Sequence, residues 1–285
     1  RVQGLTPNPG GPTAVDLIEL TEAEFARFRD LVYRTCGIRV AENKRVLMSN
    51  RIRRRLRATG IDGYSRYYDF LRSPAGKAEM QPFLDVVTTN ETYFFRDDAH
   101  YRWLADEFLP EMIREAGERR RPRSLRLWSA ACSTGEEPYS IALKVAARRP
   151  DLAGWRLEVL GTDLSATALA AARAAAYDER ALHRVGPEDR RAFFDEGPPG
   201  RWTVRPDVRS LATFRPHNLL DRMTGEPFDC VFLKNVLIYF DAASKQKVVD
   251  VVLAALAKGG RLVVGPTEGI HGMLGGLEKV KTWLY

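Results

Sequence analysis

The stretch LRLWSAACSTGEEPYSIA, residues 125–142, decides the fold of this chain. A short apolar run that ends at Trp128 leads into small residues from Ser129 to Gly135, and two carboxylates and a proline precede an apolar helical pattern. This order predicts a strand, a tight loop and a helix. Such a unit directs backbone N–H groups and a helix N-terminus at a bound small molecule. The stretch therefore favours a cofactor-binding enzyme over a plain globular domain.

Strands and helices alternate on either side of this stretch, which predicts an α/β, Rossmann-like domain with a parallel sheet covered by helices on both faces. Residues 178–217 break the alternation with Gly-Pro pairs and a short β-like run, so we expect an inserted antiparallel β-subdomain there. The predicted strands are 125–128, 157–161, 213–215, 228–233, 261–264 and an edge strand at 280–285, and the predicted helices are 138–147, 166–176 and 243–256.

The amino-terminal part has a different, helical pattern. Residues 1–15 are rich in proline and glycine and are interpreted as a flexible tail. Thr21 and Glu24 match a capping box, and Gly37 and Gly60 are placed to end helices. Helices are expected at 21–37, 41–59, 65–72 and 77–87. We therefore expect a helical domain over residues 16–88 and a catalytic domain over 89–285.

Composition bounds the class of protein. The chain has 285 residues, 45% hydrophobic residues and a net charge of +7, which fits a globular protein of two domains. Its three cysteines form no CxxC pair or Cys/His cluster, so we expect no metal site and no disulfide framework. It has neither an apolar run of membrane-spanning length nor a signal-peptide pattern. The expected location is the cytoplasm.

The loop after the first strand restricts the ligand. It contains neither G-x-G-x-x-G nor G-x-x-x-x-G-K-[ST], which disfavours a diphosphate-containing nucleotide. Ser133 and Glu136 match a second capping box, and one alternative is that both loop glutamates only cap the helix. Asp163 follows the second strand, where a carboxylate can accept hydrogen bonds from two ribose hydroxyls. The alternative for Asp163 is again a helix cap.

Two further polar segments are expected at the same edge of the sheet. A hydrophobic strand leads directly into Lys234 and Asn235, and ligands bind at the carboxyl ends of strands in open α/β sheets. Asn218 and Leu219 follow another strand and are candidates to bracket a purine ring. Turn formation is the competing explanation for Asn218.

Five motifs in order resemble one family. They are TTNETYFFRD (88–97), LWSAACSTGEEPYSIA (127–142), GTDLS (161–165), HNLLD (217–221) and FDCVFLKNVLIYFD (228–241). Over residues 20–269 the chain resembles the CheR-type chemoreceptor methyltransferases, which are S-adenosylmethionine-dependent protein-glutamate O-methyltransferases. The resemblance implies S-adenosylmethionine as cofactor, S-adenosylhomocysteine as product and a helical amino-terminal domain that docks a receptor.

The resemblance also implies roles for single residues. Glu136 would face the methionine end of the cofactor, Asp163 its ribose, and Tyr239 the transferable methyl group. Further cofactor contacts would be Asn90, Thr92, Arg96, Asn218, Leu219, Lys234 and Asn235. Relatives usually have arginine at position 234, and G-H-S-E where this chain has Gly265-Pro266-Thr267-Glu268.

A glutamate carboxylate is already a nucleophile at neutral pH, so the expected reaction needs positioning and exclusion of water rather than a strong base. Arg96 would steer the substrate carboxylate and Tyr239 would fix it or the methyl group. The structural alternatives are a surface arginine and a core tyrosine.

A basic helix suggests the partner. The docking candidates on helix 41–59 are Arg51, Arg53, Arg54, Arg55 and Arg57, which suit a glutamate-rich helical receptor segment. A solvated charged face is the plainer explanation. We expect a monomer that binds the cytoplasmic domain of a chemoreceptor or a related signalling protein, with no nucleic acid and no membrane insertion. Two alternatives remain: a methyltransferase for RNA or a small molecule, which the charge of +7 would suit, and a non-catalytic cofactor-sensing module.

Overall fold

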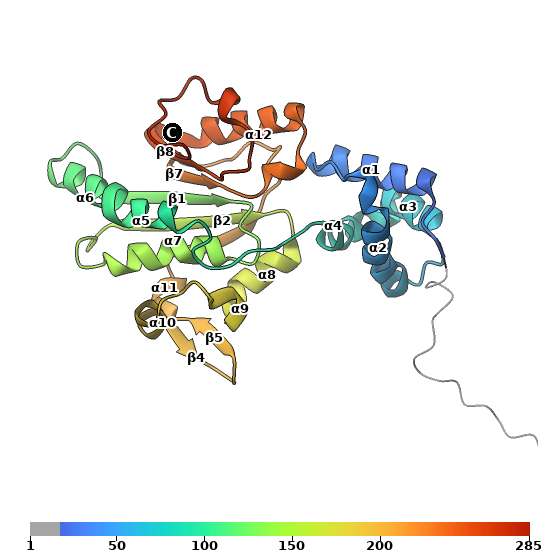
Figure 1. Cartoon of the computed structure of the whole chain (residues 1–285), viewed down its shortest axis with the longest axis horizontal. Helices are drawn as coiled ribbons and strands as arrows, with labels where there is room; N and C mark the ends of the chain where they lie inside the picture. The colour runs from blue at the N-terminus through green and yellow to red at the C-terminus, as the bar shows by residue number, and fades with distance from the viewer. Residues whose placement is uncertain (1–17) are drawn as a thin grey trace, which may run out of the picture. The chain divides into compact units, whose positions relative to one another are not determined.

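Figure 1 shows the computed structural model of the chain, which describes residues 18–285. The predicted tail, residues 1–15, lies outside the described residues. The chain divides into two compact units. The first consists of the described residues up to Thr35 together with Arg39–Thr88, and the second consists of Cys36–Ile38 and Thr89–Tyr285.

The first unit is helical, as predicted. The Thr21–Glu24 capping box is confirmed, because the Glu24 amide donates to Thr21 Oγ1 at 3.3 Å and the Thr21 amide donates to Glu24 Oε2 at 3.0 Å. The helix predicted at 77–87 begins as a 3₁₀ turn and becomes α-helical at Met80. The elements are α1 (Glu22–Cys36), η2 (Glu42–Lys44), α2 (Arg45–Thr59), α3 (Tyr64–Arg72), η3 (Pro74–Glu79) and α4 (Met80–Val87).

The second unit is built on a five-stranded sheet in the order β6-β2-β1-β7-β8. All four strand pairs are parallel, and the register places Trp128 of β1 between Leu160 of β2 and Val231 of β7. The strands are β1 (Ser124–Ala130), β2 (Arg156–Asp163), β6 (Ala212–Pro216), β7 (Phe228–Leu233) and β8 (Leu256–Val264), so the five internal strands predicted from the sequence are confirmed.

Helices cover both faces of this sheet because β1 and β7 are apolar on both sides. Leu127 and Phe232 belong to one buried cluster, with Tyr139 and Ile141 of α7 (Glu136–Ala147). The neighbouring residue Trp128 belongs to the opposite cluster, which the side chains of α12 (Ala242–Ala255) complete. In Figure 1, α12 and α7 lie on opposite faces of the sheet. Further helices of this unit are α5 (Asp98–Trp103), the π-helical turn η4 (Leu104–Phe108), α6 (Leu109–Gly117), α8 (Ala166–Ala174) and the 3₁₀ turn η6 (His271–Met273).

The predicted β-subdomain is present but shorter than predicted. Three short antiparallel strands pair in the order β3-β5-β4. The assigned range 178–217 is wrong at its carboxyl end, because β6 pairs in parallel with β2 and belongs to the main sheet. The inserted elements are β3 (Ala176–Asp178), α9 (Glu179–Leu182), α10 (Pro187–Phe193), β4 (Phe194–Glu196), β5 (Arg201–Val204) and α11 (Pro206–Arg209).

The end of the chain also departs from the prediction. Residues 280–285 do not form a regular strand. Only the last residues pair with β8: the Leu262 amide donates to the Tyr285 carbonyl at 2.8 Å and the Val264 amide donates to the Trp283 carbonyl at 2.9 Å. The tight turn at 281–284 explains this, because it leaves too few extended residues for a full ladder.

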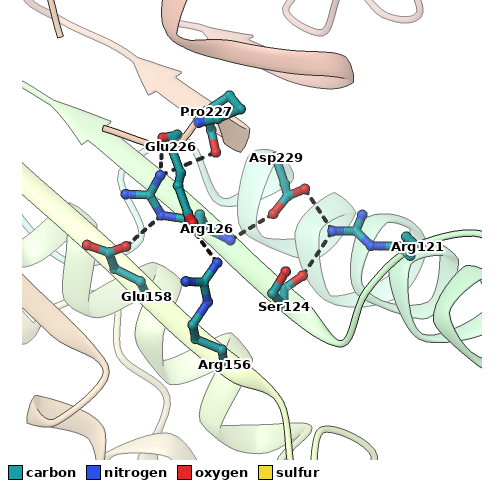
Figure 2. A network of polar contacts seen from close by, with 8 residues as sticks. All are labelled: Arg121, Ser124, Arg126, Arg156, Glu158, Glu226, Pro227 and Asp229. Carbon is teal, nitrogen blue, oxygen red and sulfur yellow. Dashed lines mark hydrogen bonds and ion pairs between the residues drawn. The ribbon is translucent and has the colours of Figure 1, made fainter. Parts of the chain in front are cut away.

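A network of charges joins the amino-terminal ends of the strands (Figure 2). Asp229 of β7 accepts from Arg121 at 2.7 Å and from the Arg126 amide of β1 at 2.8 Å. The Arg126 side chain in turn donates to Glu158 of β2 at 2.7 Å. These partly buried pairs tie three adjacent strands together at the edge opposite to the strands' carboxyl ends. Among residues 18–285, no helix is both long and apolar enough to span a membrane.

Candidate active site

The strand order changes direction at β1. The chain adds β2 and β6 on one side of β1 and β7 and β8 on the other, and ligands in such sheets bind at this point, outside the carboxyl ends of the strands. The loop after β1 has three residues with positive φ: Ala131 (+62°), Ser133 (+50°) and Gly135 (+97°). A Cβ at Gly135 would lie 2.8 Å from the Ala172 side chain, so glycine is also required by packing.

Asp163 holds this loop against the end of β2. Its Oδ2 accepts the Ser133 amide at 2.8 Å, and its Oδ1 accepts the Ser165 amide at 2.8 Å. Ser165 caps α8 by accepting the Ala168 amide at 3.1 Å, so Asp163 is not the helix cap. These two amides fix the direction of the Asp163 carboxylate at the end of β2.

The predicted capping box at Ser133 and Glu136 is wrong. Gly135 is the N-cap of α7, and Glu136 instead accepts the Thr134 hydroxyl at 2.7 Å. Glu136 is 4% exposed, and burial raises the pKa of its carboxyl group. The Ser133 hydroxyl is buried and has no hydrogen-bond partner among the described residues. An orphaned hydroxyl beside Asp163 is the feature expected where a polar ligand completes the site.

The segment after β6 lies next to Asp163. The His217 amide donates to the Asp163 carbonyl at 3.0 Å, which brings the ends of β6 and β2 together. Asn218 uses its Oδ1 to accept the Leu220 amide at 3.2 Å, so it has the turn-forming role that competed with ligand binding. Leu219 is 7% exposed and packs in the cluster around Trp128.

Arg96 lies in a short bent segment before α5. Its guanidinium is half-buried, donates to the Glu91 carbonyl at 3.1 Å and lies 5.8 Å from the centre of the Tyr93 ring. Asn90 is exposed and Thr92 half-buried in the extended stretch that leads to it. Within residues 18–285, no hydrogen bond joins Asn90 or Thr92 to the groups around Asp163, so their role as cofactor contacts stays a prediction.

Lys234 connects the segment that carries Arg96 to the start of α7. Its ammonium donates to the Arg96 carbonyl at 2.7 Å and lies 3.4 Å from Glu137 Oε2 and 3.5 Å from Asp97 Oδ2. Ser129 at the end of β1 donates to the other oxygen of Glu137 at 2.8 Å. The Lys234 side chain is only 1% exposed, which leaves it little surface for a ligand. Asn235, which follows, has φ +58° and is half-buried.

Glu268 is a site residue to which the sequence analysis gave no role. It is fully buried and its carboxylate accepts the backbone amides of Asn235, Val236 (3.2 Å) and Leu237 (2.7 Å). Burial raises the pKa of Glu268, and these three donors oppose that increase. The carboxylate thereby fixes the start of the 3₁₀ turn η5 (Leu237–Tyr239), whose last residue, Tyr239, is 39% exposed. A lone glutamate four residues past the apolar end of β8 was the available signal.

The arginine helix α2 belongs to the other unit and is only partly available. Arg55 forms a two-pronged pair with Glu79 at 2.7 and 2.9 Å, and Tyr67 donates to the same carboxylate at 2.7 Å. Arg51 donates to the Val87 carbonyl at 2.7 Å and Arg53 to the Ile18 carbonyl at 2.9 Å. Exposed arginines on α2 are Arg54 and Arg57.

Comparison with known proteins covers both units. Residues 23–88 match "CheR methyltransferase, all-alpha domain" and residues 90–284 match "CheR methyltransferase, SAM binding domain". A probable chemotaxis protein methyltransferase of Rhizobium etli is 38% identical and covers 85% of this chain and 91% of its own length. Chemotaxis protein methyltransferase 1 of Pseudomonas aeruginosa is 37% identical, with 88% and 92% covered, and its Vibrio cholerae namesake is 35% identical, with 94% and 96% covered.

The parallel sheet, the carboxylate at the end of β2 and the match of residues 90–284 define the class of protein: an S-adenosylmethionine-dependent methyltransferase. Since both parts of the chain match and the relatives are aligned over nearly their whole length, the chain belongs to the CheR methyltransferase family. The resemblance stated from the sequence is thereby confirmed. Among residues 18–285, no three His, Cys, Asp or Glu side chains are grouped so that they could hold a metal ion.

Proposed function

We propose that this protein methylates the γ-carboxylate of glutamate residues in the cytoplasmic domains of chemoreceptors or related signalling proteins, which gives glutamate methyl esters. The observation that carries the proposal is that both units match the CheR family and that the relatives are named chemotaxis protein methyltransferases. A methyltransferase for RNA or a small molecule is not favoured, because the whole chain, including the helical unit, follows the chemotaxis relatives.

The residues at the rim suit a cofactor of this kind. Asp163 is proposed to accept the ribose hydroxyls, and the hydrogen bonds from the Ser133 and Ser165 amides fix the direction of its carboxylate. The loop residues Ser133 and Glu136 are proposed to contact the methionine portion. When bound, S-adenosylmethionine supplies a methyl group on a positively charged sulfur, which a carboxylate can take up without a prior proton transfer.

Arg96 and Tyr239 are proposed to orient the substrate. Both are accessible at the edge of the site, Arg96 half-buried and Tyr239 39% exposed. Arg96 attracts the incoming carboxylate by a charge-assisted hydrogen bond, and its hold must weaken as the carboxylate loses its charge in the transition state. Since the nucleophile is already ionised and the methyl group already activated, the reaction needs no Lewis acid and no general base. We therefore propose a metal-independent mechanism.

Receptor docking is assigned to the exposed part of α2. Arg54 and Arg57 are exposed and thus accessible to carboxylates of a helical substrate, whereas Arg51, Arg53 and Arg55 are half-buried and bind groups of the protein itself. A glutamate-rich helix would thus meet a partly preordered basic surface. We propose that the protein acts as a monomer in the cytoplasm.

The test is direct methyl transfer. The protein is incubated with methyl-labelled S-adenosylmethionine and purified cytoplasmic fragments of chemoreceptors. We expect label on the receptor that alkali releases as methanol, and a large loss of transfer with Arg96→Ala. Alkali-stable label, label on added RNA, or receptor labelling that Arg96→Ala leaves unchanged would each contradict the proposal.

A further inference from the structure

The backbone that carries Arg96 is unusual. Phe95 and Asp97, the residues on either side, both have positive φ, +55° and +63°. This left-handed conformation is uncommon for residues other than glycine, and it is least favourable for bulky side chains. A segment with two such residues needs contacts from elsewhere in the protein to keep it in place.

The segment before Arg96 is held by an apolar contact of Phe95 and by a hydrogen bond to the Ser140 hydroxyl. Phe95 is 4% exposed and lies in the cluster that fills one side of the sheet. Its amide donates to Ser140 Oγ of α7 at 3.0 Å, and the preceding amide, of Phe94, donates to the Ala181 carbonyl at 3.0 Å. These contacts fix the segment before Arg96 but do not hold Arg96 or Asp97.

The Lys234 ammonium supplies the missing anchor. A lysine ammonium has three N–H donors, and four oxygens lie within 3.5 Å of this one: the Arg96 carbonyl at 2.7 Å, Glu137 Oε2 at 3.4 Å, and Asp97 Oδ2 and the Tyr101 hydroxyl at 3.5 Å each. Asp97 Oδ2 is buried and has no hydrogen-bond partner within residues 18–285, so the ammonium is the charge that balances it. Glu137 is tied to β1 through Ser129, which connects the anchor to the sheet.

We propose that Lys234 is a positioning residue for Arg96 rather than a cofactor contact. Its ammonium joins the carboxyl end of β7 and the start of α7 to the strained 95–97 segment, and it keeps the Arg96 guanidinium aimed at the substrate side of the rim. The side chain is 1% exposed and its donors point at protein oxygens. This inference rests on the proposed function for the role of Arg96, but not for the geometry that Lys234 maintains.

A double-mutant cycle between Lys234 and Arg96 tests the proposal. Lys234→Met removes the charge and the donors at nearly constant length, and Lys281→Met, at a lysine on the surface turn near the chain end, is the control. Two quantities are measured in each background: the Kd of S-adenosylhomocysteine by calorimetry and kcat/KM for receptor methylation. Because a displacement of about 1 Å can cost about 100-fold in rate, we expect Lys234→Met to lower kcat/KM by about that factor when Arg96 is present.

If Lys234 acts through Arg96, then Lys234→Met added to Arg96→Ala should change neither quantity by more than about threefold, since coupled residues are not additive. If the double variant instead lost the product of the two single-variant losses, Lys234 would act independently of Arg96, as a cofactor contact would. That result would overturn the proposal. Lys281→Met is expected to change neither quantity in either background.

Amide hydrogen exchange gives a readout that does not need activity. Lys234→Met should speed exchange at residues 95–98, with the strands of the sheet unaffected, and Lys281→Met should not. Unchanged exchange at 95–98 would overturn the proposal even if activity were lost. If Lys234→Met does not fold, Lys234→Gln, which keeps one donor for the Arg96 carbonyl, replaces it in both experiments. A wild-type protein that methylates no receptor would refute the proposed function, while the exchange experiment would still decide the role of Lys234.

Discussion

The Ser133 amide donates a hydrogen bond of 2.8 Å to Asp163 Oδ2, and this bond joins the loop after β1 to the end of β2. This carboxylate thus fixes a loop whose residues at 131, 133 and 135 have positive φ. The position of the loop and that of the proposed ribose-binding carboxylate therefore depend on the same contact.

Asp163→Asn should weaken cofactor binding without unfolding the protein. The amide keeps one acceptor oxygen, but it loses the negative charge and turns an NH₂ group toward either the Ser133 or the Ser165 amide. Hydrogen bonds to charged groups contribute about 1.5–3 kcal/mol, so we expect the Kd of S-adenosylhomocysteine to rise roughly 10- to 100-fold. Calorimetry measures the change. Asp207→Asn, in an exposed pair with Arg149, is the matched control and should leave the Kd unaltered.

Glu268→Gln should lower both stability and turnover. The carboxylate accepts three consecutive amides, and a glutamine has only one oxygen to offer them, so at least one buried N–H loses its partner. An unsatisfied buried donor costs about 1–3 kcal/mol. Thermal or urea unfolding measures this loss, and kcat reports whether Tyr239 has moved with η5. Glu226→Gln, at an exposed ion pair with Arg156, is the control and should leave the unfolding transition nearly unchanged.

The sequence predicted the strands of the parallel sheet because their apolar runs are short, continuous and followed by turn residues. The run Phe228–Leu233, for example, coincides with β7. Boundaries were less accurate where a pattern changes from one local structure to another, as at η3 and α4, or where pairing depends on a distant partner, as for β6.

The candidate site was predictable where a single position carries the chemistry. Asp163 could be placed because it follows directly after a strand, and its carboxylate does lie beside the loop. The contacts of Lys234 and Glu268 could not be found in this way, since their partners lie 138 and about 30 residues away in sequence. The capping box at Ser133 failed because Gly135, with its positive φ, starts the helix two residues later.

Acid should destabilise the protein partly through His100. This side chain is 3% exposed, and its ring centroid lies 4.3 Å from that of Trp283, with the two rings tilted by 45°. Burial, assisted by the Lys234 charge and opposed by Asp97, lowers the pKa of His100 from 6.5 to about 4. The unfolded chain therefore binds a proton that the folded chain does not. The stabilising contribution is complete above pH 6.5 and is lost as pH falls from there toward 4.

His100→Phe keeps a ring against Trp283 and removes the titration. Between pH 7 and pH 4, the wild type should lose roughly 3 kcal/mol more unfolding free energy than the variant, at about 1.4 kcal/mol per pH unit. Urea unfolding at a series of pH values measures both slopes. Parallel slopes would mean that His100 titrates normally in the folded protein.

The arginines of α2 should separate into two groups on mutation. Arg55→Met removes the partner of Glu79, which is 10% exposed and also binds Tyr67, so we expect the helical unit to lose roughly 1–3 kcal/mol. Arg54 and Arg57 are exposed, so Arg54→Glu with Arg57→Glu should change the unfolding free energy by less than about 1 kcal/mol.

The exposed arginines of α2 should affect the binding of the receptor substrate rather than stability. Charge reversal at Arg54 and Arg57 should raise KM for a glutamate-rich receptor fragment by about tenfold at low salt, and the difference should shrink as salt screens the contact. The Kd of S-adenosylhomocysteine should stay constant, because none of the proposed cofactor contacts is a residue of α2. As a matched control, Arg114→Glu reverses a charge on α6, outside that unit, and should leave KM unchanged. If the α2 reversal raised KM no more than Arg114→Glu, the exposed arginines would be a solvated face and receptor docking would have to lie elsewhere.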